Sequence, residues 1–441
     1  MTLLPNLIFA ILFFTGIAVF AKNVKKIIRN IRLGISENRS DQSPLRWKQM
    51  LRVALGQSKM VSRPIAGALH IVVYIGFIII NIELLEIIVD GFLGTHRVFA
   101  PYLGTFYNVL IASFEILALL VIVAVFFFWT RRNIIKIKRF FNPEMKGWPK
   151  TDANLILYIE VVLMSLFLTM NASDFWLQTK EVSNYSLAGS FPVSQFITPL
   201  FDGFSVASVI AIERTTWWLH ILGILLFLNY LYYSKHLHII LAFPNTYFAN
   251  LQSKGQLSNL DSVTAEVKLM MDPSVDSYAN SPEDQEIVKF GACDVVDLSW
   301  IQLLNAYTCT ECGRCTSECP ANQTGKVLSP RKIMMDTRDR LEEVGKNIDT
   351  YKGSFVPDGK QLLNDYITQE ELWACTSCNA CVEACPIGID PLSIIIDMRR
   401  YLVMEQSSAP SELNNMMSNI ENNGAPWPFS PMDRLNWKNE L

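Results

Sequence analysis

The sequence is poor in histidine and nearly balanced in charge. Its 441 residues include 5 histidines, and 38 Lys and Arg residues oppose 41 Asp and Glu residues, giving a formal net charge of −3. This balance gives no indication of nucleic-acid binding. No G-x-G-x-x-G motif is present, which argues against a dinucleotide or flavin site. No histidine follows His238, which argues against a mixed cysteine–histidine zinc site in the C-terminal half.

The cysteines, by contrast, are regularly spaced. Eight of the nine cysteines form two runs of C-x-x-C-x-x-C-x-x-x-C-P. In ferredoxins with two such runs, three cysteines of each run hold one [4Fe–4S] cluster and the fourth ligates the other cluster. The pattern therefore predicts two clusters. Their predicted ligands are Cys309, Cys312, Cys315 and Cys385 for the first, and Cys375, Cys378, Cys381 and Cys319 for the second.

Structural zinc and disulfides are the alternatives for these cysteines. Zinc sites commonly use two C-x-x-C pairs, whereas here a three-plus-one spacing occurs twice. Disulfides are disfavoured by the reducing compartment predicted below. The ninth cysteine, Cys293, is expected to be a buried free thiol.

Long apolar segments crowd into residues 1–243. A bilayer core needs about 20 apolar residues per helix. No basic region precedes the first segment, so it is interpreted as a retained helix and not as a signal peptide. The sequence predicts an all-α bundle of five transmembrane helices over residues 1–243. The five segments are 4–21, 65–89, 105–129, 153–172 and 215–241.

The basic residues of the loops predict how this bundle is oriented. The loops after the first and third segments are rich in Lys and Arg. The loop after the second segment has only Arg97, and the loop after the fourth offers only Lys180 and Arg214. Because positively charged loops stay in the cytoplasm, the N-terminus is expected outside and the C-terminus inside. The predicted location is the inner (cytoplasmic) membrane, multi-pass, with the iron–sulfur domain facing the cytoplasm.

All five histidines lie in or beside the membrane segments. Ionisable groups there are costly and usually functional, and imidazole is the usual axial ligand of haem b. On one continuous helix, His220 and His238 would share a face about 27 Å apart. This predicts one or two haems b, held by His70 with His238 and by His96 with His220. A solvated His96 with a single haem is the alternative, and His236 stays open as a rival to His238.

Charged residues near these histidines extend the predicted site. Arg63 lies where it could hold a haem propionate. Carboxylates at membrane depth could pass protons, and Glu115 in the third segment is the favoured candidate. The alternative is a carboxylate held by hydrogen bonds within the bundle. The other carboxylates considered are Glu83, Glu86 and Glu160.

The remainder of the chain is predicted in three parts. Residues 244–290 form a polar, proline-containing linker. Residues 291–405 form an α-helical two-cluster ferredoxin domain, with helices expected over 330–343 and 391–404. Residues 406–441 form a tail that is expected to dock a partner.

Both halves resemble known families. The segment 217–248, with W-W-L-H, S-K-H-L-H and F-P-N-T-Y-F, resembles the cytochrome b subunit of respiratory nitrate reductase and the membrane subunit of heterodisulfide reductase. That family has a second histidine on helix two, near Ile80, where this chain has none. The segment 309–331, C-T-E-C-G-R-C-T-S-E-C-P-A-N-Q-T-G-K-V-L-S-P-R, resembles the catalytic heterodisulfide reductase subunit and glycolate oxidase iron–sulfur subunits.

The resemblance implies a fusion of two modules usually found on separate subunits. The segment 422–437 resembles the hinge before the cysteine-rich domains of those proteins, which implies a separate cytoplasmic partner carrying such domains. The chain is thus expected to pass electrons, in either direction, between quinone (expected to be menaquinone), haem b, the two clusters and this partner. It would be an oxidoreductase subunit without a terminal substrate site. The alternative is a haem-free membrane-anchored ferredoxin, or a structural anchor for a soluble redox complex.

Overall fold

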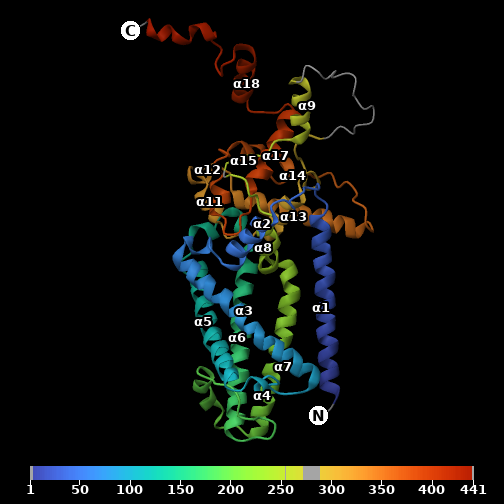
Figure 1. The fold of residues 1–441 in the computed structure, drawn as a ribbon, viewed down its shortest axis with the longest axis vertical. Coiled ribbons are helices and arrows are strands. Elements are labelled where there is room, and N and C mark those ends of the chain that lie inside the picture. The colour runs from blue at the N-terminus through green and yellow to red at the C-terminus, as the bar shows by residue number, and fades with distance from the viewer. Residues whose placement is uncertain (1–2, 254, 272–288, 440–441) are drawn as a thin grey trace.

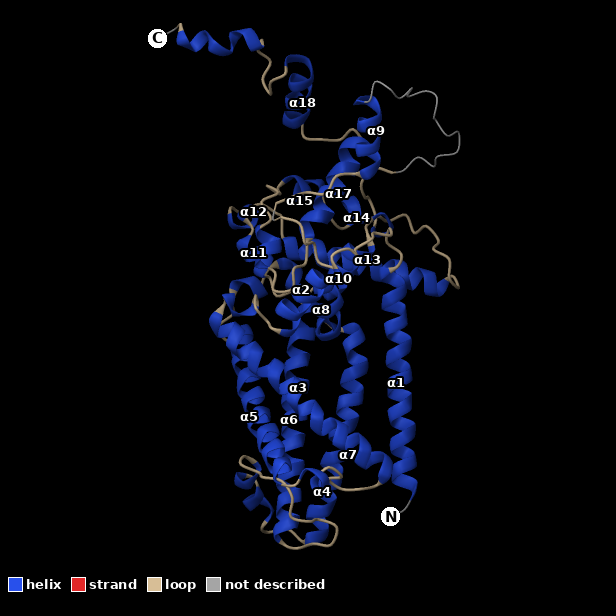
Figure 2. Ribbon diagram, viewed as in Figure 1, coloured by secondary structure: helices blue, strands red, loops and turns tan. Residues whose placement is uncertain are grey.

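The computed structural model describes residues 3–253, 255–271 and 289–439. In these residues the chain is helical, and extended pairing is limited to isolated bridges, such as the one between Ile35 and Ser299 (Figure 2). Long helices form one end of the molecule, and a group of short helices caps it (Figure 1). The cap, residues 289–405, is called the module below. The opposite end of the bundle is called the far end.

Five helices in the described residues are long and apolar enough to cross a membrane, as the sequence predicts. Large apolar side chains of α1, such as those of Leu7, Ile11 and Phe14, are exposed, as expected for a surface that faces lipid. The membrane helices are α1 (Leu3–Ile31), α3 (Pro64–Leu93), α5 (Thr105–Asn133), α6 (Trp148–Thr179) and α7 (Val206–Tyr230).

Shorter helices complete the described chain. The α-helices are α2 (Ser43–Met50), α4 (Ala100–Leu103), α8 (His238–Tyr247), α9 (Asp261–Met271), α10 (Trp300–Thr308), α11 (Arg314–Glu318), α12 (Pro320–Gln323), α13 (Pro330–Thr350), α14 (Leu362–Asp365), α15 (Gln369–Trp373), α16 (Ala380–Ala384), α17 (Pro391–Met404) and α18 (Ser411–Asn423). Short 3₁₀-helical segments, and one π-helical segment at Leu51–Leu55, complete the described helices. The 3₁₀ segments are Met60–Ser62, Lys138–Phe140, Pro143–Met145, Ser194–Phe196, Thr198–Phe201, Leu231–Tyr233, Lys235–Leu237, Val295–Asp297 and Pro431–Lys438.

The fifth membrane segment differs from its prediction. A single helix was expected over 215–241, but α7 ends at Tyr230, and the backbone of Ser234 is extended, with φ −111° and ψ 144°. The Ser234 hydroxyl accepts a hydrogen bond from the N–H of His236 at 3.1 Å and so caps a new turn. His220 and His238 therefore lie on different helices, and the shared-face argument for them is wrong.

Both helices expected in the module are confirmed. Ser329 caps α13 by accepting from the N–H of Lys332 at 3.4 Å, and Pro330 occupies the first helical position, where its missing N–H costs nothing. The helix runs past the predicted end to Thr350. The other helix, α17, has the predicted bounds.

The module and the bundle share one hydrophobic core. Ile27 and Ile31 of α1 belong to the same buried cluster as Leu303 and Leu341 of the module. Polar contacts support this packing, since Asn30 Nδ2 donates to Tyr307 Oη at 2.8 Å. The predicted boundaries between domains stay a prediction, but the contacts show that the module is packed against the membrane helices.

The linker and the tail are described in part. Of the predicted linker 244–290, residues 244–247 belong to α8, and α9 is a further helix, while residues 272–288 lie outside the described residues. In the tail, α18 and the 3₁₀ segment Pro431–Lys438 extend away from the module (Figure 1, red). The docking role of the tail stays a prediction.

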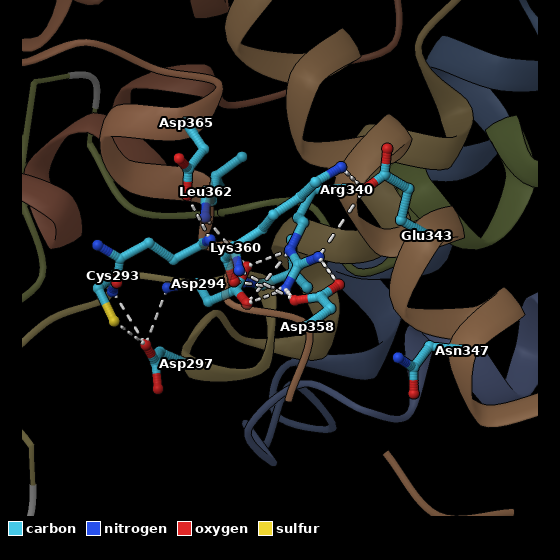
Figure 3. A network of polar contacts seen from close by, with 12 residues as sticks. Cys293, Asp294, Asp297, Arg340, Glu343, Asn347, Asp358, Lys360, Leu362 and Asp365 are labelled. Carbon is cyan, nitrogen blue, oxygen red and sulfur yellow. Dashed lines mark hydrogen bonds and ion pairs between the residues drawn. The ribbon is translucent and has the colours of Figure 1, made fainter. Parts of the chain in front are cut away.

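A buried arginine pins the long loop after α13. Arg340 is fully buried and pairs with Asp294 at 2.8 Å and Asp358 at 2.6 Å, and it donates to the carbonyl of Lys360 at 2.7 Å (Figure 3). Beside this network, Cys293 is a buried free thiol, as predicted. The arginine thereby ties three separate stretches of the module together.

Replacing this arginine tests its role. We expect Arg340→Met to lower the stability of the module by about 3 kcal/mol, because the carboxylates of Asp294 and Asp358 would lose their shared positively charged partner. The control on the same helix is Lys346→Met, whose side chain is 79 % exposed, and which should change stability by less than about 0.5 kcal/mol. Thermal unfolding of the two variants in detergent measures the difference. Equal melting temperatures would contradict the assigned role.

Candidate iron–sulfur and histidine sites

Two cavities in the module are lined by the predicted cysteine sets. The first is lined by Cys309, Cys312, Cys315 and Cys385. The second is lined by Cys375, Cys378, Cys381 and Cys319. The fourth cysteine of each run thus lies in the cavity of the other run. This cross-run arrangement is the one that two-cluster ferredoxins use.

The two cysteine loops repeat one backbone conformation. Glu311 and Ser377, each two residues after the first cysteine of a run, both have φ 56°. Gly313 and Asn379, each four residues after it, have φ 70° and 61°. At Gly313 a Cβ atom would lie 2.5 Å from Nη1 of the buried Arg331, so space favours glycine there, whereas asparagine adopts the same conformation in the second loop. Local geometry therefore curls both loops around their cavities in the same way.

The thiols of the first cavity are buried or half-buried. In the residues that the structure describes, no group of three or more His, Cys, Asp or Glu side chains is arranged to hold one ion. Burial raises the pKa of Cys309 to about 12 and that of Cys385 to about 11. Because metal ligation requires thiolates, cluster assembly must release these protons.

The first cysteine loop docks directly onto the membrane bundle. Lys235 Nζ donates to Glu311, between Cys309 and Cys312. Arg63 donates to Ser317 at 2.7 Å and to Glu318 at 2.9 Å. Arg63 was predicted to hold a haem propionate. Its observed partners belong to the module, and its propionate role stays a prediction.

More arginines gather at this junction. Arg331 is fully buried and donates to the carbonyl of Arg139 at 2.7 Å, and it pairs with Glu144 at 2.7 Å. Burial, aided by the charge of Arg63, lowers the pKa of Arg139 to about 10. The first cavity therefore lies beside a positively charged junction. Positive charge close to a cluster favours its reduced form.

Three histidines meet at the end of the bundle next to the module. The rings of His236 and His238 lie 5.3 Å apart, and His70 is close enough to interact electrostatically with His238. Nδ1 of His70 is buried and has no hydrogen-bond partner. Nδ1 of His238 donates to the carbonyl of Lys235 at 3.1 Å, which leaves Nε2 free. Burial lowers the pKa of His236 to about 3, so that ring is neutral.

The predicted second histidine pair is not brought together. His96 Nε2 lies 3.3 Å from Asp174, whereas His220 Nδ1 donates to the carbonyl of Leu163 at 3.1 Å. Asp174 and Leu163 are separated by eleven positions on α6, which is about 16 Å of helix. One iron needs both ring nitrogens within bonding distance. The observed contacts of His96 and His220 do not support their pairing, which stays a prediction.

Glu115 has three hydrogen-bond partners. Its carboxylate accepts from the N–H groups of Val193 and Ser194 at 2.9 and 3.0 Å, and from Asn171 Nδ2 at 3.3 Å. These contacts anchor the loop after α6 at the far end of the bundle. Proton transfer by Glu115 stays a prediction. In contrast, Oε2 of the buried Glu83 has no partner.

Sequence reasoning missed a buried polar cluster at the far end. Arg97, used only as an orientation marker, pairs with Asp174 at 2.5 Å and donates to Tyr107 at 3.1 Å and to Asn171 at 3.0 Å. Asp174 could have indicated this cluster, because a carboxylate inside an apolar membrane helix requires a polar or charged partner. Lys235 and its partner Glu311 were missed as well.

Serine variants test the cross-run ligation. Cys309→Ser and Cys385→Ser should remove the same cluster, and Cys378→Ser and Cys319→Ser the other one, because each pair lines one cavity. Each single variant should lower the iron content from about eight to about four atoms per chain, as two cubanes require. Electron paramagnetic resonance of the reduced proteins identifies the surviving cluster. If Cys385→Ser and Cys378→Ser lost the same signal, ligation would instead follow the runs.

Comparison with known proteins supports the iron–sulfur assignment. Residues 308–389 match the model of the 4Fe-4S dicluster domain. A probable iron-sulfur-binding oxidoreductase, FadF of Bacillus subtilis, is 29% identical over 98% of this chain and 61% of its own length. An EtfAB:quinone oxidoreductase of Syntrophomonas wolfei is 26% identical over 91% of this chain and 55% of its own length.

Heterodisulfide reductases are also among the relatives. One component of a ferredoxin/F(420)H(2)-dependent CoB-CoM heterodisulfide reductase of Methanosarcina acetivorans is 33% identical over 24% of this chain and 52% of its own length. No solved structure matches the chain. The chain spans little more than half the length of these relatives. Together with the cavities and the five long helices, the comparisons show a membrane-anchored iron–sulfur electron-transfer protein that is related to oxidoreductases.

Proposed function

We propose that the chain passes electrons between quinone in the membrane and a cytoplasmic redox partner, using one haem b and the two clusters. One observation carries this proposal. The unpartnered, buried Nδ1 of His70 lies beside His238 and His236, at the end of the bundle where the first cysteine loop docks. A haem bound there would accept and release single electrons, as the clusters do.

The donor set fits an axially ligated haem. His70 and His238 would hold it, from α3 and from the start of α8. His238 is favoured over His236, because its Nδ1–H is committed to the carbonyl of Lys235 and its Nε2 is free. Nε2 of His236 instead faces Glu160 at 3.9 Å. A single haem agrees with the separation of His96 from His220.

Charge and exposure support the proposed orientation and the proposed partner. The module lies at the end of the bundle where Arg131, Arg132 and Arg139 gather, which supports a cytoplasmic module by the positive-inside rule. In the second cavity, Cys378 is exposed, so this cluster would be the one accessible to a partner. We propose an oxidoreductase partner with cysteine-rich domains, on the resemblance to heterodisulfide reductases.

Quinone, expected to be menaquinone, is the proposed membrane substrate. Its support is the relative described as a quinone oxidoreductase, together with the buried carboxylates of the bundle. Quinone chemistry couples electrons to protons, and a buried carboxyl without a partner, such as that of Glu83, suits proton transfer. The chain itself would be a subunit, with the terminal reaction on the partner.

Histidine variants test the haem site. The purified protein should contain one haem b per chain, and both His70→Ala and His238→Ala should lose it, because each removes one axial ligand. The matched control is His96→Ala, which should keep the full haem content, since His96 contacts Asp174 at the far end. The reduced-minus-oxidised optical spectrum reports the haem of each variant. Clusters without haem in the unchanged protein would leave a membrane-anchored ferredoxin, the alternative function.

A further inference from the structure

Lys235 contacts both the histidine site and the first cysteine loop. Its carbonyl accepts the Nδ1–H of His238 at 3.1 Å, which fixes the orientation of that ring. Its ammonium donates to Glu311, which lies between Cys309 and Cys312. A single residue thus joins a proposed haem ligand to the loop around the first cavity.

The contact between Lys235 and Glu311 is buried and firmly held. The side chains of Lys235 and Glu311 are 9 % and 2 % exposed, so water screens their charges weakly. Arg338 of α13 also pairs with Glu311, at 2.9 Å. On the membrane side, the Lys235 ammonium donates to the carbonyl of Pro149 at 2.6 Å, and its N–H donates to Asp152 at 3.2 Å.

Asp152 ties this contact to two membrane helices. It lies on α6, it is buried, and its other oxygen accepts from the hydroxyl of Tyr230 at the end of α7 at 2.5 Å. The Lys235 ammonium itself lies 3.8 Å from Asp152. The charged groups around Lys235 are therefore Glu311, Asp152, Arg132 and, through Glu311, Arg338. Contacts from both halves of the chain hold the lysine in place.

The second cavity is placed differently. The start of its loop is held within the module, since Arg399 of α17 donates to the carbonyl of Leu372 at 3.0 Å and to that of Cys375. Toward the end of the run, Glu383 lies 4.0 Å from Lys59 of the bundle half. One of its cysteines, Cys378, is exposed, whereas Cys309 of the first cavity is buried. The first cavity faces the bundle through Glu311, Ser317 and Glu318.

We infer that Lys235 and Glu311 are positioning residues that link the haem-binding histidine to the first cluster, and that the first cluster is the one through which the module exchanges electrons with the membrane. This inference rests on the proposed function. The charge of Lys235 acts on the first cluster through the contact with Glu311, and it acts on the haem through space, because the backbone of Lys235 lies against the ring of His238. The second cluster would exchange electrons with the partner.

Opposite changes of charge should shift the two centres in opposite directions. Lys235→Met removes a positive charge, so the oxidised forms are stabilised and the midpoint potentials of the haem and the first cluster fall. Glu311→Gln removes a negative charge and should raise both. We expect a change of about tenfold in each reduction equilibrium, which is about 59 mV for one electron. The second cluster should keep its potential.

The experiment is a redox titration of the purified full-length protein in detergent. Optical spectra follow the haem, and electron paramagnetic resonance follows the clusters. The Cys378→Ser variant, which lacks a ligand of the second cluster, identifies the first cluster's signal. The matched control is Lys289→Met, which removes a lysine paired with Asp297 at 2.6 Å and should shift neither centre. Lys235→Arg keeps the charge and should restore potentials close to those of the unchanged protein.

The results separate the inference from the proposed function. Joint shifts of the haem and the first cluster, opposite in sign for Lys235→Met and Glu311→Gln, would support the link. Unchanged potentials, or a larger shift of the second cluster, would overturn it while leaving the haem site intact. Absence of haem from the unchanged protein would overturn the proposed haem function and the link together. If Lys235→Met fails to fold, Glu311→Gln carries the test alone.

Discussion

The docking of the first cysteine loop onto the membrane bundle is the contact on which the arrangement depends. A cluster carries electrons to or from the membrane only if it is held close to a membrane site. Here a buried ion pair between Lys235 and Glu311 holds it, together with a core shared by Ile27 and Ile31 of α1 and Leu303 of the module. The ion pair and the shared core both form only when the membrane helices and the module are folded and packed together. The proposed redox sites therefore depend on the packing of the whole chain, because each of them draws on residues that are distant in the sequence.

The two cavities differ in their surroundings. The first is buried beside a group of arginines at the junction with the bundle, and its loop contacts membrane-side residues. The second has an exposed cysteine and is held from within the module by Arg399. Burial and positive charge at one cluster and exposure at the other are the features expected of a chain with a membrane end and a partner end. Because these features belong to the protein part of the sites, they do not depend on the direction of electron flow.

Sequence predicted what depends on local spacing and composition. The five long apolar helices and the bounds of α17 follow from hydrophobic length and helix start signals, and the structure bears them out. The cross-run cysteine sets follow from ligand spacing, and each predicted set lines one cavity. Sequence failed where tertiary context decides. The break at Ser234 follows no proline or glycine, and it separates His220 from His238. The partners of His96 and Glu115 come from distant helices and loops, so no periodicity could have shown them.

The central claim is that the clusters exchange electrons with quinone through the membrane part. The direct measurement starts from purified protein that is fully reduced with dithionite under anaerobic conditions and freed of excess reductant. It is mixed with a water-soluble menaquinone analogue, and the cluster signals are followed by rapid-freeze electron paramagnetic resonance. The account predicts that the quinone oxidises both clusters in the unchanged protein, and that His70→Ala, which lacks the proposed haem ligand, slows this oxidation severely. Clusters that stay reduced with the quinone, or that are oxidised equally fast in His70→Ala, would contradict it.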